Sequence, residues 1–291
     1  MRKCFLPWVE NAGRYLHWGM LSKNPNAFYL FESNQDKLNW RNLCVNLNAI
    51  SLLETNEDEI YWYTLSSDPN AMPLLEANPN KIDWFELSCN PNALPLLEAN
   101  PDKIDWCELS CNPNALPLLE ANPDKIDWNY LCFNEKAIHL LEANRDKINW
   151  DCLCENPNAI PLLEANQDKI HWFSLSENPN AIHILEANPD KINWYNLSGN
   201  RNAMHLLEAN QDKIDWSNLS SNVNAMDLLE ANQDKIDWFY MTLNPSIFQW
   251  DYPFYRKRMD VHREELMKAV FHPKFLERSL ESGYDLFNGL E

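Results

Sequence analysis

Tryptophan recurs along this chain at a constant spacing of 22 residues. Eleven of the 13 tryptophans lie on this lattice, and only Trp8 and Trp250 fall outside it. The lattice positions are 18, 40, 62, 84, 106, 128, 150, 172, 194, 216 and 238, without one insertion or deletion. A fixed period of this length is the signature of a repeat architecture, in which each repeat buries its apolar face against its neighbours.

Other residues keep the same phase as tryptophan. A leucine follows three residues after each tryptophan from Leu21 to Leu219, and a Leu-Leu pair followed by glutamate recurs in almost every repeat. Residues 25–244 hold ten such repeats. We predict an N-terminal cap with a partial repeat over 1–24, the repeat solenoid over 25–244, and a C-terminal helical cap over 245–291 that includes short helices around His272-Pro273.

Each repeat divides into two segments of about ten residues. In the repeat 91–112, Asn92 is expected to cap the first helix, and Pro95 is tolerated only in a first turn. Asn100-Pro101 should end that helix, because a residue before proline is pushed out of the α region. Asp105 should cap a second, shorter α or 3-10 helix. The sequence therefore predicts an all-α solenoid of ten 22-residue repeats.

The alternative fold is a leucine-rich-repeat horseshoe. The run Ile104-x-Trp106-x-x-Leu109-x-x-Asn112 approaches its signature, but the second apolar position is displaced. The repeat also has little β-branched content beyond isoleucine, which favours helices. In an open helical solenoid, we expect Trp128→Ala in the middle to be far more destabilising than Trp18→Ala at the end.

Charge and composition exclude several classes of function. The formal net charge is -19, from 43 acidic and 24 basic side chains. Such a surface repels nucleic acid and anionic lipid. No run of about 18 apolar residues is present, so we expect no membrane span, and the N-terminus does not resemble a secretory signal. No phosphate-binding glycine loop or nucleophile motif appears, and we expect no cofactor and no small-molecule ligand.

Residues that could suggest chemistry instead follow the repeat. Cys44, Cys132 and Cys154 occupy a site that is serine in most repeats, and His183 and His205 are equivalent first-turn positions. A glutamate recurs once per repeat, and lysines of the same period are expected to offset its charge. We interpret these residues as structural, and therefore predict no catalytic residue and no metal site.

The positions directly after tryptophan vary from repeat to repeat. Variation in an otherwise constant repeat marks side chains that do not support the core, and aromatic residues there are the kind of anchor that dominates interfaces. We predict a partner-binding strip on these positions. It consists of Phe85, Glu86, Tyr130, Phe173, Tyr195, Asn196, Phe239 and Tyr240.

The repeat also resembles a known family. The run Asp190-Lys191-Ile192-Asn193-Trp194-Tyr195-Asn196-Leu197-Ser198, and the tail from Lys268 to Arg278 with Gly283-Tyr284-Asp285, are similar to short repeat proteins of giant amoeba-infecting DNA viruses. The resemblance implies a protein–protein interaction role, in the host cytoplasm or a virion. We therefore expect a non-catalytic scaffold that binds a host or viral protein. The alternatives are a structural component of a viral assembly, and an enzyme with a site near His262 and His272.

Overall fold

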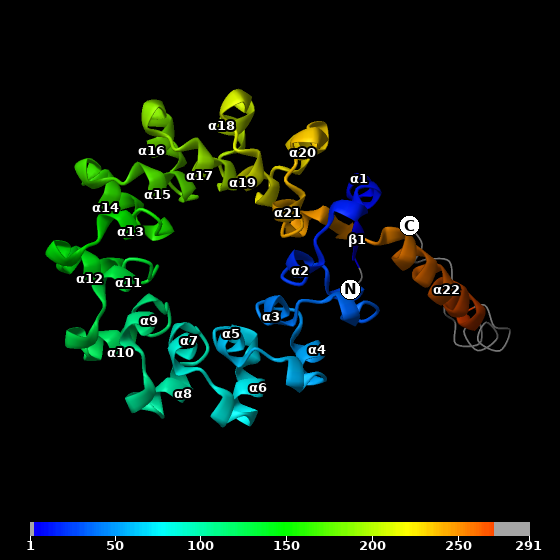
Figure 1. The fold of residues 1–291 in the computed structure, drawn as a ribbon, viewed down its shortest axis with the longest axis horizontal. Coiled ribbons are helices and arrows are strands. Elements are labelled where there is room, and N and C mark those ends of the chain that lie inside the picture. Colours follow the sequence, from blue (N-terminus) through cyan, green and yellow to red (C-terminus); the bar gives the residue numbers. More distant parts are fainter. Residues whose placement is uncertain (1–2, 271–291) are drawn as a thin grey trace, which may run out of the picture. The chain divides into compact units, whose positions relative to one another are not determined.

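The structure is a computed structural model that describes residues 3–270. These residues form two separate bodies. Residues 5–248 make up the first, and residues 3–4 with 249–270 belong to the second. No helix in the described range is long and apolar enough to cross a membrane. The all-α repeat solenoid predicted from the sequence is confirmed in the first body (Figure 1).

Most repeats contain an outer α-helix, a 3-10 turn and an inner α-helix. In the repeat 91–112 these are α8 (Leu94–Glu98), the turn Pro101–Lys103, and α9 (Trp106–Cys111). Two repeats have a second 3-10 turn before the outer helix, at Pro69–Ala71 and Pro157–Ala159. Pro95 lies in the first turn of α8, as predicted. The Asp105 side chain accepts a hydrogen bond from the backbone N–H of Glu108 at 3.0 Å and caps α9, which is also as predicted.

The prediction that Asn92 caps the outer helix is wrong. Helix α8 begins at Leu94 without a side-chain cap. Asn90 instead accepts from the backbone N–H of Asn92 at 2.9 Å, and the Asn92 amide donates to the carbonyl of Pro69 at 2.9 Å, one repeat away. The contact with the neighbouring repeat satisfies the Asn92 side chain, and this neighbour cannot be inferred from a single repeat.

The helices alternate between two concentric rows (Figure 1). The inner row is α2 (Trp18–Leu21), α3 (Trp40–Leu43), α5 (Trp62–Ser66), α7 (Trp84–Cys89), α9, α11 (Trp128–Leu131), α13 (Trp150–Leu153), α15 (Trp172–Glu177), α17 (Trp194–Gly199), α19 (Trp216–Ser221) and α21 (Trp238–Met241). The outer row is α1 (Pro7–Asn11), α4 (Ile50–Glu54), α6 (Met72–Ala77), α8, α10 (Leu116–Ala121), α12 (Ile138–Ala143), α14 (Ile160–Glu164), α16 (Ile182–Ala187), α18 (Met204–Ala209) and α20 (Met226–Ala231). The repeat that contains α3 has the 3-10 turn Phe28–Leu30 in the outer position.

The core runs continuously between the two rows. In the repeat of α9, Ala93, Leu97 and Leu109 are completely buried, and their equivalents are buried in the other repeats. The lattice tryptophans, which the sequence placed in the core, are only partly buried and pack against its edge. None of these helices exceeds six residues, too few to be stable alone in water, so the stacking of repeats must hold them in place.

A ladder of buried asparagines ties each repeat to the one before it. The Asn134 side chain donates to the carbonyls of Ser110 and Asn112 at 3.1 and 2.9 Å. Equivalent pairs of bonds are made by Asn46, Asn90, Asn112, Asn156, Asn178, Asn200, Asn222 and Asn244. Asp68 stands at this site in one repeat, and its Oδ2 atom is buried without a hydrogen-bond partner.

The ladder continues from the last repeat to the first and closes the array into a ring. The Asn24 side chain donates to the carbonyls of Thr242 and Asn244 at 2.9 and 3.0 Å. The Asn26 amide donates to the carbonyl of Pro245 at 2.7 Å, as Asn92 does to Pro69. These bonds join residues about 220 positions apart with the same pattern found between sequential repeats. The body 5–248 is therefore a closed ring of eleven repeats.

The eleventh repeat is assembled from both ends of the ring. The turn Pro245–Ile247 supplies its beginning, and α1, the 3-10 turn Gly13–Tyr15 and α2 supply the rest. Val9 is completely buried, as is Leu53, which lies 44 residues further along the chain at the same phase. The ring of Phe5 stacks on that of Phe248 with centroids 4.6 Å apart. Residues 5–17, in which the sequence shows no repeat, thus complete one.

Ring closure changes the expectation for the terminal tryptophan. Trp18 has a repeat on both sides, and Lys37 lies over its ring at 4.9 Å, as Lys147 lies over Trp128 at 4.2 Å. The two sites are equivalent, so we now expect Trp18→Ala and Trp128→Ala to destabilise the ring to a similar extent.

The remaining described elements are a strand pair and one long helix. Strand β1 (Lys3–Phe5) pairs with β2 (Phe248–Trp250), and α22 spans Tyr252–Val270 in the second body. Lys3 lies over the Trp250 ring at 5.0 Å. The helices predicted around His272-Pro273 lie outside the described residues.

Candidate functional site

The inner helices leave one side free of packing. Neighbouring inner helices flank each of them, and the outer row lies behind (Figure 1). The leucine and the serine or cysteine found three and four residues after each lattice tryptophan are buried, except that Met241 and Thr242 take their place in the last repeat. Positions one, two and five after tryptophan lie on the opposite side of the inner helix, toward the centre of the ring, and are exposed or half-buried except for Ser174 and Asn196. We call these positions the inner wall.

Exposed aromatic side chains gather on the inner wall. They are Tyr63, Phe85, Tyr130, Phe133, Phe173, Tyr195, Phe239 and Tyr240, with exposed fractions from 37% to 54%. Within the ring, the other large apolar side chains with comparable exposure are Tyr15, Val45, Leu47 and Tyr61, and Val45 also lies on the inner wall. The outer helices contribute none. The apolar surface of the ring is therefore concentrated on its inner side.

The structure places most of the predicted strip on this wall. Phe85, Phe173, Tyr195 and Phe239 are exposed one position after tryptophan, and Tyr130 and Tyr240 are exposed two positions after it. Glu86 is half-buried beside them. Asn196 is different, because it is 8% exposed and its amide donates to the carbonyl of Phe173 at 2.8 Å, so it links repeats.

Sequence reasoning missed two members of the wall. Tyr63 follows Trp62 directly and is 54% exposed, and Phe133 lies five positions after Trp128 and is 42% exposed. Tyr63 lies directly after a lattice tryptophan, like Phe85 and Phe173, so its position in the sequence could have identified it. Phe133 shares the phase of Cys89 and Cys111, and only the helical geometry shows that this third position belongs to the same face.

Carboxylates occupy one side of the inner wall. They are Glu86, Glu108, Asp151, Glu155 and Glu177, which fall in the five adjacent repeats from Trp84 to Trp172. No lysine or arginine stands at an inner-wall position of these five repeats; Lys23 and Arg41 occupy such positions elsewhere in the ring. We call the inner wall of these five repeats, from Phe85 to Glu177, the acidic arc.

Neighbouring groups raise the pKa values of several arc residues. Partial burial and the adjacent Glu86 raise the pKa of Glu108 above its ordinary value. A hydrogen bond to Glu86 raises the pKa of Tyr63, and the charge of Glu108 raises that of Tyr130. The carboxylate of Glu108 is thus close enough to Glu86 and to the Tyr130 hydroxyl for both to influence its pKa.

The cysteines take the hydrogen-bonding place of serine. The Cys154 sulfur accepts from the backbone N–H of His171 at 3.3 Å, as the Ser176 hydroxyl does from Asn193 at 2.9 Å. Four buried or half-buried thiols have strongly raised pKa values because burial disfavours the thiolate. They are Cys89, at about 12, and Cys111, Cys132 and Cys154, at about 11. These thiols stay protonated at neutral pH and are poor nucleophiles and metal ligands.

Charged side chains outside the wall mostly contact the preceding repeat. His139, His183 and His205 pair with Glu120, Glu164 and Glu186 at 3.0, 2.8 and 2.7 Å. Seven lysines lie over the tryptophan 19 residues before them, from Lys37 over Trp18 to Lys235 over Trp216. These ammonium groups lie over aromatic rings, and the expectation that their charge offsets the glutamate ladder stays a prediction.

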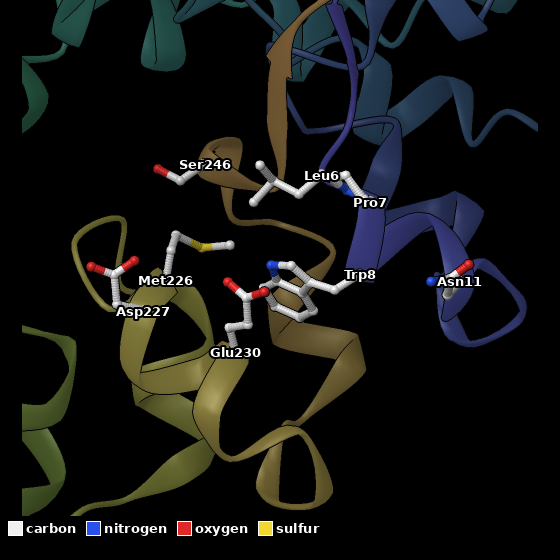
Figure 2. Close-up of a pocket in the computed structure, with 8 residues that line it drawn as sticks. All are labelled: Leu6, Pro7, Trp8, Asn11, Met226, Asp227, Glu230 and Ser246. Carbon is white, nitrogen blue, oxygen red and sulfur yellow. The ribbon is translucent and has the colours of Figure 1, made fainter.

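A hollow of about 560 Å³ lies where the ring closes. Figure 2 shows Leu6, Trp8, Met226 and Glu230 pointing toward this space, while Asn11 turns away. Pro7 stands at the phase of His139, so Glu230 meets no histidine here. The residues that line the hollow come from both ends of the ring.

Comparisons with known proteins give no relative. No protein-family model, no curated protein and no solved structure matches the chain. The function must therefore be inferred from the ring itself.

Proposed function

We propose that this protein is a non-catalytic interaction scaffold whose inner wall binds a protein partner. The observation that carries the proposal is the gathering of eight exposed aromatic side chains on one side of the ring. Large aromatic side chains anchor protein interfaces because they bury much area at low cost in conformational entropy. The outer helices carry no such side chains.

The setting of the interaction is proposed from the family resemblance. Similarity to giant-virus repeat proteins suggests a host or viral partner, met in the host cytoplasm or in a viral assembly. A structural role in a virion would use the same inner wall. An enzyme with a site near His262 and His272 has no observation in its favour, since His272 and the side chain of His262 lie outside the described residues.

Site-specific photo-cross-linking tests the proposal. A photoreactive amino acid replaces Phe85 on the inner wall or, as a matched control, Glu98 on the outer helix α8 of the next repeat. Each variant is exposed to lysate from infected and uninfected amoebae, and products are identified by mass spectrometry. We expect a defined product from position 85 that is absent from position 98.

Three aromatic residues supply the second half of the test. Phe173, Tyr195 and Phe239, here called the aromatic triad, are replaced together by serine. Because their rings are 43% to 53% exposed, the ring should stay folded, with an unchanged circular dichroism spectrum. The cross-linked product should decrease at least tenfold. Products that come from position 98 and persist in the triad variant would refute the inner wall as the binding surface.

A further inference from the structure

The size of the ring limits what its centre can hold. Packed helix axes lie about 8–10 Å apart, so eleven inner helices place their axes on a circle of about 16 Å radius. Subtracting about 5–6 Å for a helix with its side chains leaves an opening of about 20 Å. The exposure of the inner-wall aromatics is consistent with a solvent-filled centre. A polypeptide helix about 10–12 Å wide fits against one side of it.

The acidic arc selects the charge of the occupant. Its inner-wall positions carry five carboxylates and no cation, and Phe85, Tyr130, Phe133 and Phe173 lie among them. Partial burial and the nearby charge of Glu86 raise the pKa of Glu108. A cationic segment would relieve this repulsion, whereas the phosphates of a nucleic acid would increase it.

The arc also selects the secondary structure of the occupant. An extended peptide gains its affinity by adding a strand to an exposed sheet edge. The inner helices provide no such edge, because their backbone groups are bonded within the helices or to the capping side chains of residues such as Asp105 and Asp127. Only side chains are presented to the centre. A helix that shows apolar and basic side chains on one face matches such a surface.

We propose that the acidic arc binds a basic amphipathic α-helix of a partner protein. The arc aromatics contact the apolar face of this helix, and its lysine and arginine side chains pair with Glu86, Glu108, Asp151, Glu155 and Glu177. This inference rests on the proposed function, because it names the chemistry of the partner that the inner wall binds.

Peptide binding to the full chain tests the inference. The probes are three fluorescein-labelled 18-residue peptides. One is an amphipathic helix of lysine and leucine, the second has glutamate in place of lysine, and the third is the lysine peptide with two central prolines that break the helix. Fluorescence anisotropy at 50 and 200 mM NaCl gives each Kd. We expect the lysine helix to bind at least tenfold more tightly than either other peptide, and more weakly at the higher salt.

Matched charge variants distinguish binding at the acidic arc from the general attraction of a cationic peptide to an acidic protein. The arc variant carries E86Q, E108Q, D151N, E155Q and E177Q. The control variant carries E54Q, E76Q, E98Q, E142Q and E208Q on the outer helices, and has the same net charge. We expect the arc variant to weaken binding of the lysine helix at least tenfold and the control variant less than twofold.

Several results would overturn the inference. Equal weakening by the two variants would show that only net charge matters, and equal binding of the proline peptide would show that helicity does not. If the glutamate helix bound best, and its binding were lost in the aromatic triad variant, the partner class would be wrong while the inner wall remained a binding surface. If no peptide bound and position 85 gave no cross-link, both proposals would fail.

Discussion

Ring closure can be tested by removing one buried amide at the seam. Asn24 is completely buried, and its side chain donates to the carbonyls of Thr242 and Asn244 across the closing contact. Its Oδ1 atom accepts from the backbone N–H of Asn26 at 3.0 Å. Asn24→Ala removes these bonds and takes a donor away from two carbonyls. The Asn244 carbonyl still accepts from the backbone N–H of Ile247 at 3.3 Å, so the loss of its bond to Asn24 and of the bond to Asn26 costs about 1 kcal/mol each. The Thr242 carbonyl is left without this donor at a cost of about 1–3 kcal/mol, so we expect a total loss of about 3–5 kcal/mol.

The comparison with an interior repeat makes the prediction specific to the ring. Asn134 makes the same bonds in the middle of the array and is equally buried. In a closed ring Asn24→Ala and Asn134→Ala should cost the same. In an open solenoid Asn24 lies at an exposed end, and its replacement should cost almost nothing.

The assay is unfolding in guanidinium chloride followed by tryptophan fluorescence, together with thermal melting. For a ring of this size, 1 kcal/mol corresponds to about 2–4 °C in Tm, so both variants should melt roughly 6–20 °C lower than the parent. Asn80→Ala, at an exposed asparagine of an outer turn, is the control and should stay within about 0.5 kcal/mol. If Asn24→Ala behaves like Asn80→Ala while Asn134→Ala is destabilised, the ring does not close in solution.

Three further predictions concern particular contacts. Asp68→Asn should raise the free energy of unfolding by about 1–3 kcal/mol at pH 7, because it completes the asparagine ladder. Burial raises the pKa of Asp68, so the protonated acid is favoured in the folded state. The gain in the free energy of unfolding should therefore shrink as pH falls toward 3 in a series of urea titrations. The thiols of Cys89, Cys111, Cys132 and Cys154 have raised pKa values, so their stabilising contribution is complete below about pH 9 and is lost as pH rises through 11 to 12. The parent should therefore lose stability over this range more steeply than a variant with serine at all four positions. Equal slopes would contradict the prediction. Lys147→Met should lower the free energy of unfolding by about 0.5–1 kcal/mol, because it removes the ammonium group over Trp128. Lys169→Met removes an exposed ion pair with Asp168 and should lower it less in the same denaturation assay.

Much of the repeat could be predicted from the sequence because the interactions involved are local. The spacing of leucines, the position of Pro95 in a first turn and the capping role of Asp105 depend on residues within a few positions of one another. The phase of Cys132 and Cys154 likewise indicated that they replace serine. Six of the eight residues of the predicted strip are exposed, but Asn196 could not be distinguished from its equivalents in other repeats without knowing that the Phe173 carbonyl lies beside it.

The 22-residue period, the helical character of each repeat and the continuous core were determined by the sequence alone. The period does not specify the rotation between repeats, which follows from how closely inner and outer helices pack. A ring needs about 33° per repeat, and a small change in that angle, summed over ten contacts, would give an open superhelix. Only the tertiary structure decided that Asn24 meets Thr242, that residues 5–17 complete an eleventh repeat, and that the variable positions after tryptophan face the centre of a ring.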